Sequence, residues 1–221
     1  MKSRFIKYLL FMFFCNFLQT SFAKEVYINA STVELDKVTK VVYAKGNVEI
    51  YDNLKNKIFS ESAVYDKSKG IVKTIGPTKI ITSEKYEVEG KDMFYDDNKK
   101  IIYSENFTVI TDINGNKISV NMFNYLTLKR MFFSTGEIEV KDNRQNKYFF
   151  SEIYIDEKSK IVGSDIKSFF NDKSFKADER NEPRFYANSG TITPENTIFE
   201  KGVFTSCKKR EGKKCPPWAI R

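Results

Sequence analysis

The sequence contains no histidine and only three cysteines among its 221 residues. Histidine is the commonest general base and the commonest metal ligand in proteins, so its absence argues against acid–base catalysis and against a structural zinc site. Acidic residues are abundant but lie chiefly in turn-like segments, and no carboxylate pair or nucleophile–base pair stands out. We therefore expect no enzyme activity, no catalytic residue, no metal and no cofactor.

The sequence also lacks a basic stripe, although its formal net charge is +8. Lys2, Arg4 and Lys7 contribute three of these charges, and residues 201–221 carry a net of six. Residues 24–200 are therefore close to neutral, at 8 − 3 − 6 = −1. This distribution excludes a nucleic-acid-binding surface along the main part of the chain.

Residues 1–23 have the pattern of a cleaved signal peptide. A positive start precedes an apolar run from Tyr8 to Leu18, and Ser21-Phe22-Ala23 matches a small-x-small cleavage site. The apolar run is too short to span a bilayer comfortably, which argues against a membrane anchor. We expect the mature chain to begin near Lys24 and to be exported.

The rest of the sequence repeats with a period of about thirty residues. Apolar residues hold the same place in five successive units, as in the columns Val33, Ala63, Met93, Phe123, Ile153; Val41, Ile71, Ile101, Met131, Ile161; Ile50, Ile80, Ile110, Val140, Phe170; and Ile28, Ile58, Val88, Ile118, Tyr148. Such a period is typical of units that bury their apolar faces by stacking on their neighbours.

Each unit reads as short strands separated by polar turns, with almost no helix. Apolar and polar residues alternate, turns start with Asp36, Asp66 or Asp96, and Gly46 and Gly76 interrupt strand-like runs. Two hairpin-type connections per unit favour antiparallel pairing. The sequence therefore predicts an all-β fold, a repetitive antiparallel β-jelly roll made of a folded-over sheet, with one apolar inner face.

Two interpretations of that inner face remain open. The side chains pack on one another in a closed, dry core, or the sheet stays open and leaves an apolar groove suited to acyl chains. In the second case, open end strands invite another sheet to pair edge to edge. The lipid-binding residues predicted for the groove are Val33, Leu35, Val48, Ile50, Ile80, Met93, Ile110, Phe123, Ile138 and Val140.

The last residues and the repeats together resemble a known family. Cys207, a basic insert and the ending Cys215-Pro-Pro-Trp-Ala-Ile-Arg221 resemble the segment that joins the periplasmic domain to the barrel in the LptD family of lipopolysaccharide-assembly proteins. Tyr65-Asp66, Tyr95-Asp96 and the run from Gly46 to Ile50 resemble the organic-solvent-tolerance domain that LptD shares with the periplasmic bridge protein LptA.

This resemblance implies a β-jelly-roll domain over residues 24–205 that holds acyl chains of lipopolysaccharide in its groove. It implies a place in the periplasm, at the periplasmic face of the outer membrane, with an LptA-type bridge joined through sheet-edge pairing. Residues 206–221 would be the junction to an outer-membrane barrel and its lipoprotein plug. Because family members continue for hundreds of residues beyond this junction, we expect a fragment or an early-terminated product.

The resemblance also bears on the two remaining cysteines. In an oxidising compartment Cys207 and Cys215 are expected to form a disulfide, and such a short loop contributes roughly 2–3 kcal/mol at most. Two free thiols, or pairing with cysteines of the missing part, are the alternatives. Two other functions stay open for the whole chain: a free-standing LptA-type bridge protein, or an exported structural β-solenoid with a closed core.

Overall fold

The structure is a computed structural model that describes residues 26–171, 181–193, 196–209, 212 and 219–220. The predicted signal peptide and Cys215 lie outside these residues. Within them the chain is all-β, without a helix, which confirms the predicted fold class. Accordingly, no helix in this part of the chain is long and apolar enough to cross a membrane.

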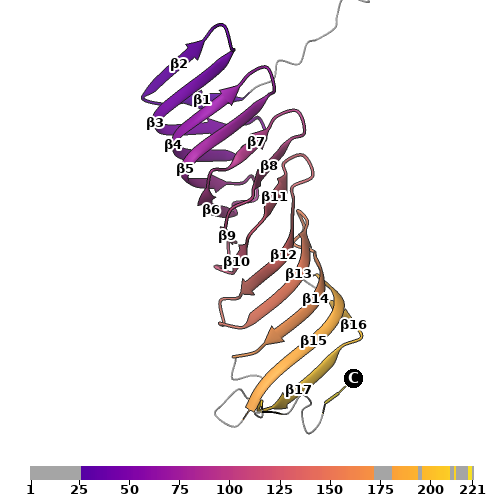
Figure 1. Cartoon of the computed structure of the whole chain (residues 1–221). Helices are drawn as coiled ribbons and strands as arrows, with labels where there is room; N and C mark the ends of the chain where they lie inside the picture. Colours follow the sequence, from indigo (N-terminus) through magenta and orange to yellow (C-terminus); the bar gives the residue numbers. More distant parts are fainter. Residues whose placement is uncertain (1–25, 172–180, 194–195, 210–211, 213–218, 221) are drawn as a thin grey trace, which may run out of the picture.

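In the described residues, 17 strands form one antiparallel sheet whose units follow one another in chain order along the molecule (Figure 1). The long strands are β3 (Val41–Tyr51), β4 (Lys57–Asp66), β5 (Ile71–Ile81), β12 (Met131–Lys141), β13 (Lys147–Ile155), β14 (Ile161–Phe169) and β15 (Asn181–Ile192). The shorter strands are β1 (Tyr27–Asn29), β2 (Thr32–Asp36), β6 (Glu87–Lys91), β7 (Phe94–Asp96), β8 (Ile101–Ser104), β9 (Thr108–Thr111), β10 (Lys117–Val120), β11 (Phe123–Leu126), β16 (Thr197–Glu200) and β17 (Val203–Cys207).

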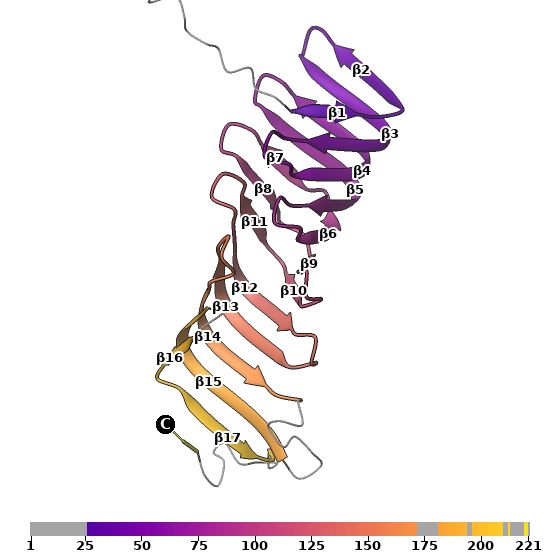
Figure 2. The ribbon, with the colours of Figure 1, turned by 180° about the vertical axis from the view of Figure 1, so that it is seen from behind.

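The sheet folds over into two layers, because the two halves of β3, β5, β12 and β15 pair with different short strands on one side. In β3, Ile50 lies opposite Ile28 of β1, whereas Val42 lies opposite Leu35 of β2. We call the layer that begins with β1 layer A and the layer that begins with β2 layer B. Layer A continues through β6, β9 and β10 to β17, and layer B through β7, β8 and β11 to β16. Figure 2 shows the same stack from behind.

The bend between the layers lies at glycine-containing bulges, as the sequence predicts. Gly46, Gly76 and Gly136 have φ values of 77°, 83° and 101°, in the left-handed region where a side chain is strained. The strand pairing slips beside Gly46 and Gly136, between Lys45 and Val48 and between Thr135 and Ile138. An extra residue in one strand bends it, so these bulges turn the chain from one layer into the other.

The opposite side of the fold, which we call the mouth, carries the turns of both layers. In layer B, Asp36, Asp66, Asp96 and Asp156 accept backbone N–H groups two residues ahead at 2.8–3.0 Å, which confirms the predicted role of Asp at the turns. The turns of layer A start with Asp52, Asp112 and Asp142, which accept N–H groups in the same way.

A ladder of asparagines ties the turns of layer A together. The side-chain oxygens of Asn56, Asn116 and Asn146 accept backbone N–H groups of the next turn, at 2.8–3.0 Å. Tyr86 stands where the ladder would have its fourth asparagine. The edge is therefore regular in three units and interrupted in one.

Near the C-terminus, the set of repeat positions that faces the interior shifts by one residue. Tyr65 pairs with Val72 across six intervening residues, but Ile155 pairs with Ile161 across five. Since side chains alternate along a strand, a turn shorter by one residue reverses the faces of β14. Ile161 consequently faces the interior, whereas Val41, Ile71, Ile101 and Met131 of the same sequence column are half-buried outside it.

Candidate functional site

The main internal opening of the described residues is an apolar cavity of about 780 Å3 between the layers of the C-terminal units. Layer A contributes Ile118, Val140 and Phe150 to its wall, and layer B contributes Ile153, Ile155 and Ile161. Aromatic rings close it toward the C-terminal end, among them Phe170, Phe185, Phe199 and Phe204. Its size and apolar wall are typical of a site for a hydrophobic ligand.

The cavity forms here because smaller side chains face inward. Ile155 continues the column of Tyr65, Tyr95 and Tyr125, which fill the interior of the preceding units. Gly163 stands inward on β14, where a Cβ atom would come within 2.5 Å of the Phe150 ring. The Phe150 ring therefore occupies the place of a side chain at position 163, and the space that a larger residue at position 155 would occupy stays empty.

The rim of the cavity at the mouth is polar and firmly hydrogen-bonded. The Asp142 carboxylate accepts the Asn146 amide at 2.9 Å and the Tyr148 hydroxyl at 3.1 Å, besides the N–H groups of its own turn. Burial, followed by the charge of Asp142, raises the pKa of Tyr148 to about 12. Burial also raises the pKa of Tyr86 on the N-terminal side of the rim. Both phenols stay neutral at physiological pH.

The N-terminal units have a filled interior at the corresponding place. The space between Ile50, Asp52, Tyr95 and Ile102 is about 10 Å3, less than a water molecule needs. The Tyr95 hydroxyl donates to Asp97 at 3.1 Å, Asp97 pairs with Lys100, and burial raises the pKa of Tyr95. Tyrosine rings and the ion pair between buried Asp97 and half-buried Lys100 thus close the mouth of these units.

Between the filled and the hollow parts, side chains of both layers meet across the mouth. The Glu84 carboxylate, on the turn of layer A between β5 and β6, accepts the Tyr125 hydroxyl from β11 of layer B. Arg130, on the turn after β11, places Nε 3.3 Å from Glu84 Oε1 and also reaches Glu157 at 3.8 Å. We call Glu84, Tyr125 and Arg130 the mouth bridge.

The ten predicted lipid-binding residues occupy three different environments. Val33 and Leu35 are 52% and 50% exposed on β2, at the N-terminal end of the stack, because no strand of the described residues covers them. Seven are buried in the packed interior: Val48, Ile50, Ile80, Met93, Ile110, Phe123 and Ile138. Only Val140 lines the large cavity. Contact of the other nine with a lipid stays a prediction.

The sequence analysis did not select most residues that line the cavity, such as Phe150, Ile155 and Ile161. The available signal was the length of the turn after Ile155, which is one residue shorter than the earlier turns of layer B. Cys207 is partly buried and unbridged in the structure, while its predicted partner Cys215 lies outside the described residues. The disulfide therefore stays a prediction.

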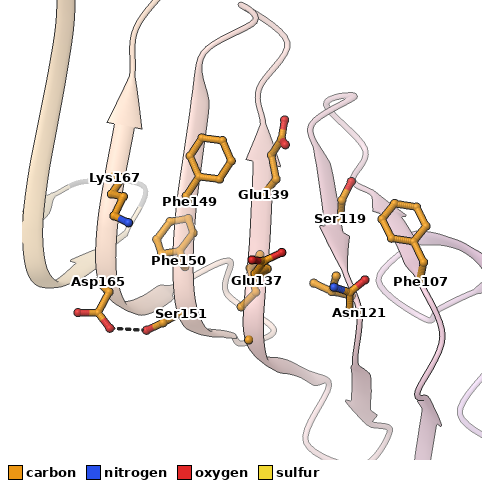
Figure 3. A pocket seen from close by; sticks show the side chains of 13 residues that line it. Phe107, Ser119, Asn121, Glu137, Glu139, Phe149, Phe150, Ser151, Asp165 and Lys167 are labelled. Atoms are coloured by element: carbon orange, nitrogen blue, oxygen red, sulfur yellow. Dashed lines mark hydrogen bonds between the residues drawn. The ribbon is translucent and has the colours of Figure 1, made fainter. Parts of the chain in front are cut away.

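A second hollow, of about 590 Å3, lies on the outer side of the bend beside Gly136 (Figure 3). Glu137, Glu139 and Phe149 line it, and Ser151 donates to Asp165 at 2.7 Å (the dashed line in Figure 3). Three repeat units earlier, the equivalent residues Asn47, Glu49 and Phe59 line a similar hollow of about 620 Å3. This recurrence identifies the outer hollow as a product of the bulges.

No group of three or more metal-ligating side chains occurs among the described residues. No family model matches the chain, and no curated protein matches it. A solved structure with a similar shape is LptH of Pseudomonas aeruginosa, the LptA-homologous periplasmic component of a lipopolysaccharide transport device. The similarity covers 50% of this chain and 82% of LptH, at 16% sequence identity and a TM-score of 0.42.

Proposed function

We propose that the cavity holds acyl chains of lipopolysaccharide, and that the chain acts in the periplasm as the N-terminal domain of an LptD-type assembly protein. The observation that supports this most directly is the apolar cavity of about 780 Å3 with a polar rim at the mouth. An amphiphile can place its hydrocarbon between the layers while its head stays in water, and aliphatic burial contributes roughly 25 cal/mol per Å2.

In this proposal the two ends of the stack are the surfaces that bind partner proteins. Val33 and Leu35 are exposed at the N-terminal end, and Ile198 is 63% exposed on β16 at the C-terminal end. Unpaired strand edges beside apolar side chains favour pairing with another sheet, such as a periplasmic bridge protein of the LptA type. In a full-length protein, residues 206–221 would lead to an outer-membrane barrel and its lipoprotein plug.

The substitution Ile155→Tyr tests the function by filling the cavity. It extends the tyrosine column of the filled units into the cavity wall, so the affinity for purified lipopolysaccharide should fall roughly tenfold, which corresponds to ~1.4 kcal/mol. Val162→Tyr, on the outer face of β14, is the matched control and should bind like the original protein. Binding is measured by native mass spectrometry or calorimetry. Absence of binding by the unaltered chain, or an unchanged affinity in Ile155→Tyr, would refute the proposal.

A free-standing bridge of the LptA type is the second candidate, favoured by the exposed apolar residues at both ends of the stack. It predicts filaments of the mature protein whose length grows with concentration. Val33→Asp would shorten such filaments, because it places a charge on the exposed end strand. Light scattering distinguishes the two candidates, since a domain of a larger assembly protein should remain monomeric by itself.

A further inference from the structure

The two turns that meet at the mouth bridge lack the residues that the equivalent turns of the other units share. In layer A, the turn has Thr82 and Tyr86 where the other units have aspartate and asparagine. In layer B, the turn begins with Leu126, whereas the other four begin with aspartate. Departures from an otherwise kept local pattern are expected at functional positions, and here the two departures lie opposite each other.

The groups that bind the two layers together lie on or directly beside these two turns. Glu84 is only 14% exposed and accepts from the Ser83 hydroxyl at 2.7 Å as well as from Tyr125 and Arg130. Glu84 and Tyr125 are 41 residues apart in the sequence and belong to different layers. In the described turns of layer B that begin with aspartate, the carboxylate instead accepts backbone N–H groups of its own turn.

The mouth bridge lies at the boundary between the cavity and the filled N-terminal units. Tyr86, two residues after Glu84, forms part of the cavity wall, and the filled units begin on the other side of it. A chain lying in the cavity therefore meets the bridge if it extends toward the N-terminus. Because the bridge is made of side-chain contacts between Glu84, Arg130 and the Tyr125 hydroxyl, it can open without breaking the backbone pairing of either layer.

We propose that Glu84, Tyr125 and Arg130 form a gate that sets how far along the interior an acyl chain can extend. With the gate closed, the ligand is confined to the C-terminal cavity. With the gate open, the layers separate at the mouth, so the side chains that fill the N-terminal units can move apart and admit the ligand. This inference rests on the proposed lipid-binding function and names the residues that control it.

Two equivalent turn positions allow a direct test. Leu54 lies at the mouth of the filled units, and Asn114 lies at the same repeat position two units later, at the rim of the cavity. A photo-reactive benzophenone amino acid replaces one or the other in the full chain, and purified lipopolysaccharide is added. We expect capture at position 114, and little at position 54 while the gate is intact.

Opening the gate should raise capture at position 54 several-fold and leave capture at position 114 unchanged. The gate variants are Glu84→Ala and the milder Tyr125→Phe, which keeps the ring in the core. Glu152→Ala and Tyr154→Phe are matched controls, because this tyrosine–glutamate hydrogen bond of 2.6 Å lies on the outer face. Circular dichroism melts identify any variant that fails to fold, in which case Tyr125→Phe decides.

The possible outcomes test the gate and the proposed lipid binding separately. Equal capture at both positions in the unaltered chain, or no increase at position 54 in a folded gate variant, would overturn the gate. Lack of capture at position 114 in the unaltered chain would instead refute lipid binding in the cavity. An equal increase in the Glu152→Ala control would show that any loss of a tyrosine hydrogen bond has the same effect.

Discussion

The N-terminal and C-terminal units share one strand pattern but differ inside. In the N-terminal units, Ile50, Tyr95 and Ile102 line a space of only about 10 Å3 between the layers. In the C-terminal units the same two layers enclose about 780 Å3. The difference comes from the side chains in a few inward columns and from one shortened turn, while the backbone architecture is the same. The interior of a repeat fold can therefore be a packed core in some units and a binding cavity in others, with the same sheet around both.

Removing side-chain volume should affect the two parts very differently. Ile80→Ala deletes a fully buried side chain from close packing and should lower the free energy of unfolding by about 2–5 kcal/mol. Ile161→Ala enlarges an existing cavity, so its cost should stay below about 2 kcal/mol. Urea denaturation of both variants measures this. Equal losses would mean that the C-terminal interior is as tightly packed as the N-terminal one.

The asparagine ladder should be equally important in both parts, because it lies on the edge and not in the interior. Asn56 and Asn146 are 2% and 4% exposed, and each satisfies a backbone N–H of the next turn. Replacing either by alanine should cost about 1–3 kcal/mol, since a backbone N–H of the next turn loses its acceptor and the buried asparagine's other hydrogen bond is lost with it. Thermal melts of the two variants should shift alike, and a much smaller shift for Asn146→Ala would extend the difference between the parts to their edges.

High pH should weaken the rim of the cavity. The pKa of Tyr148 is raised to about 12, above its ordinary value of 10.0, so the folded state favours the neutral phenol. Its contribution to stability is complete below the ordinary pKa and is lost as the pH rises toward the folded value. Tyr148→Phe cannot ionise and should therefore lose less stability over this interval. Urea midpoints compared at about pH 9 and about pH 11 give the difference.

Much of the fold followed from the sequence, because the repeat period fixes which residues share a face. The columns containing Met93 and Ile80, the Asp-led turns and the bulges at Gly46 and Gly76 lie where the pattern predicted them. These features depend on local residue types and on strict alternation, which a single sequence displays.

The candidate site was harder to predict, since it depends on the space that the inward-facing side chains leave unfilled. A fixed period places Ile161 with Met131 and Ile101, but the turn after Ile155 is one residue shorter and reverses the faces of β14. The predicted residues Ile80 and Ile110 satisfy the apolar pattern equally well in a closed core as in a groove. Side-chain volumes on facing layers decide between the two, and these are set by three-dimensional pairing.

The order of the stack has a consequence for how the chain acquires its structure. Strands pair with partners close by in the sequence, from β1 with β3 to β15 with β17, and the described pairings do not join the two ends. Folding can therefore begin at one end and propagate, with little entropy lost in closing long loops. A polypeptide that emerges from a translocation channel N-terminus first could assemble its early rungs while the later ones are still in transit.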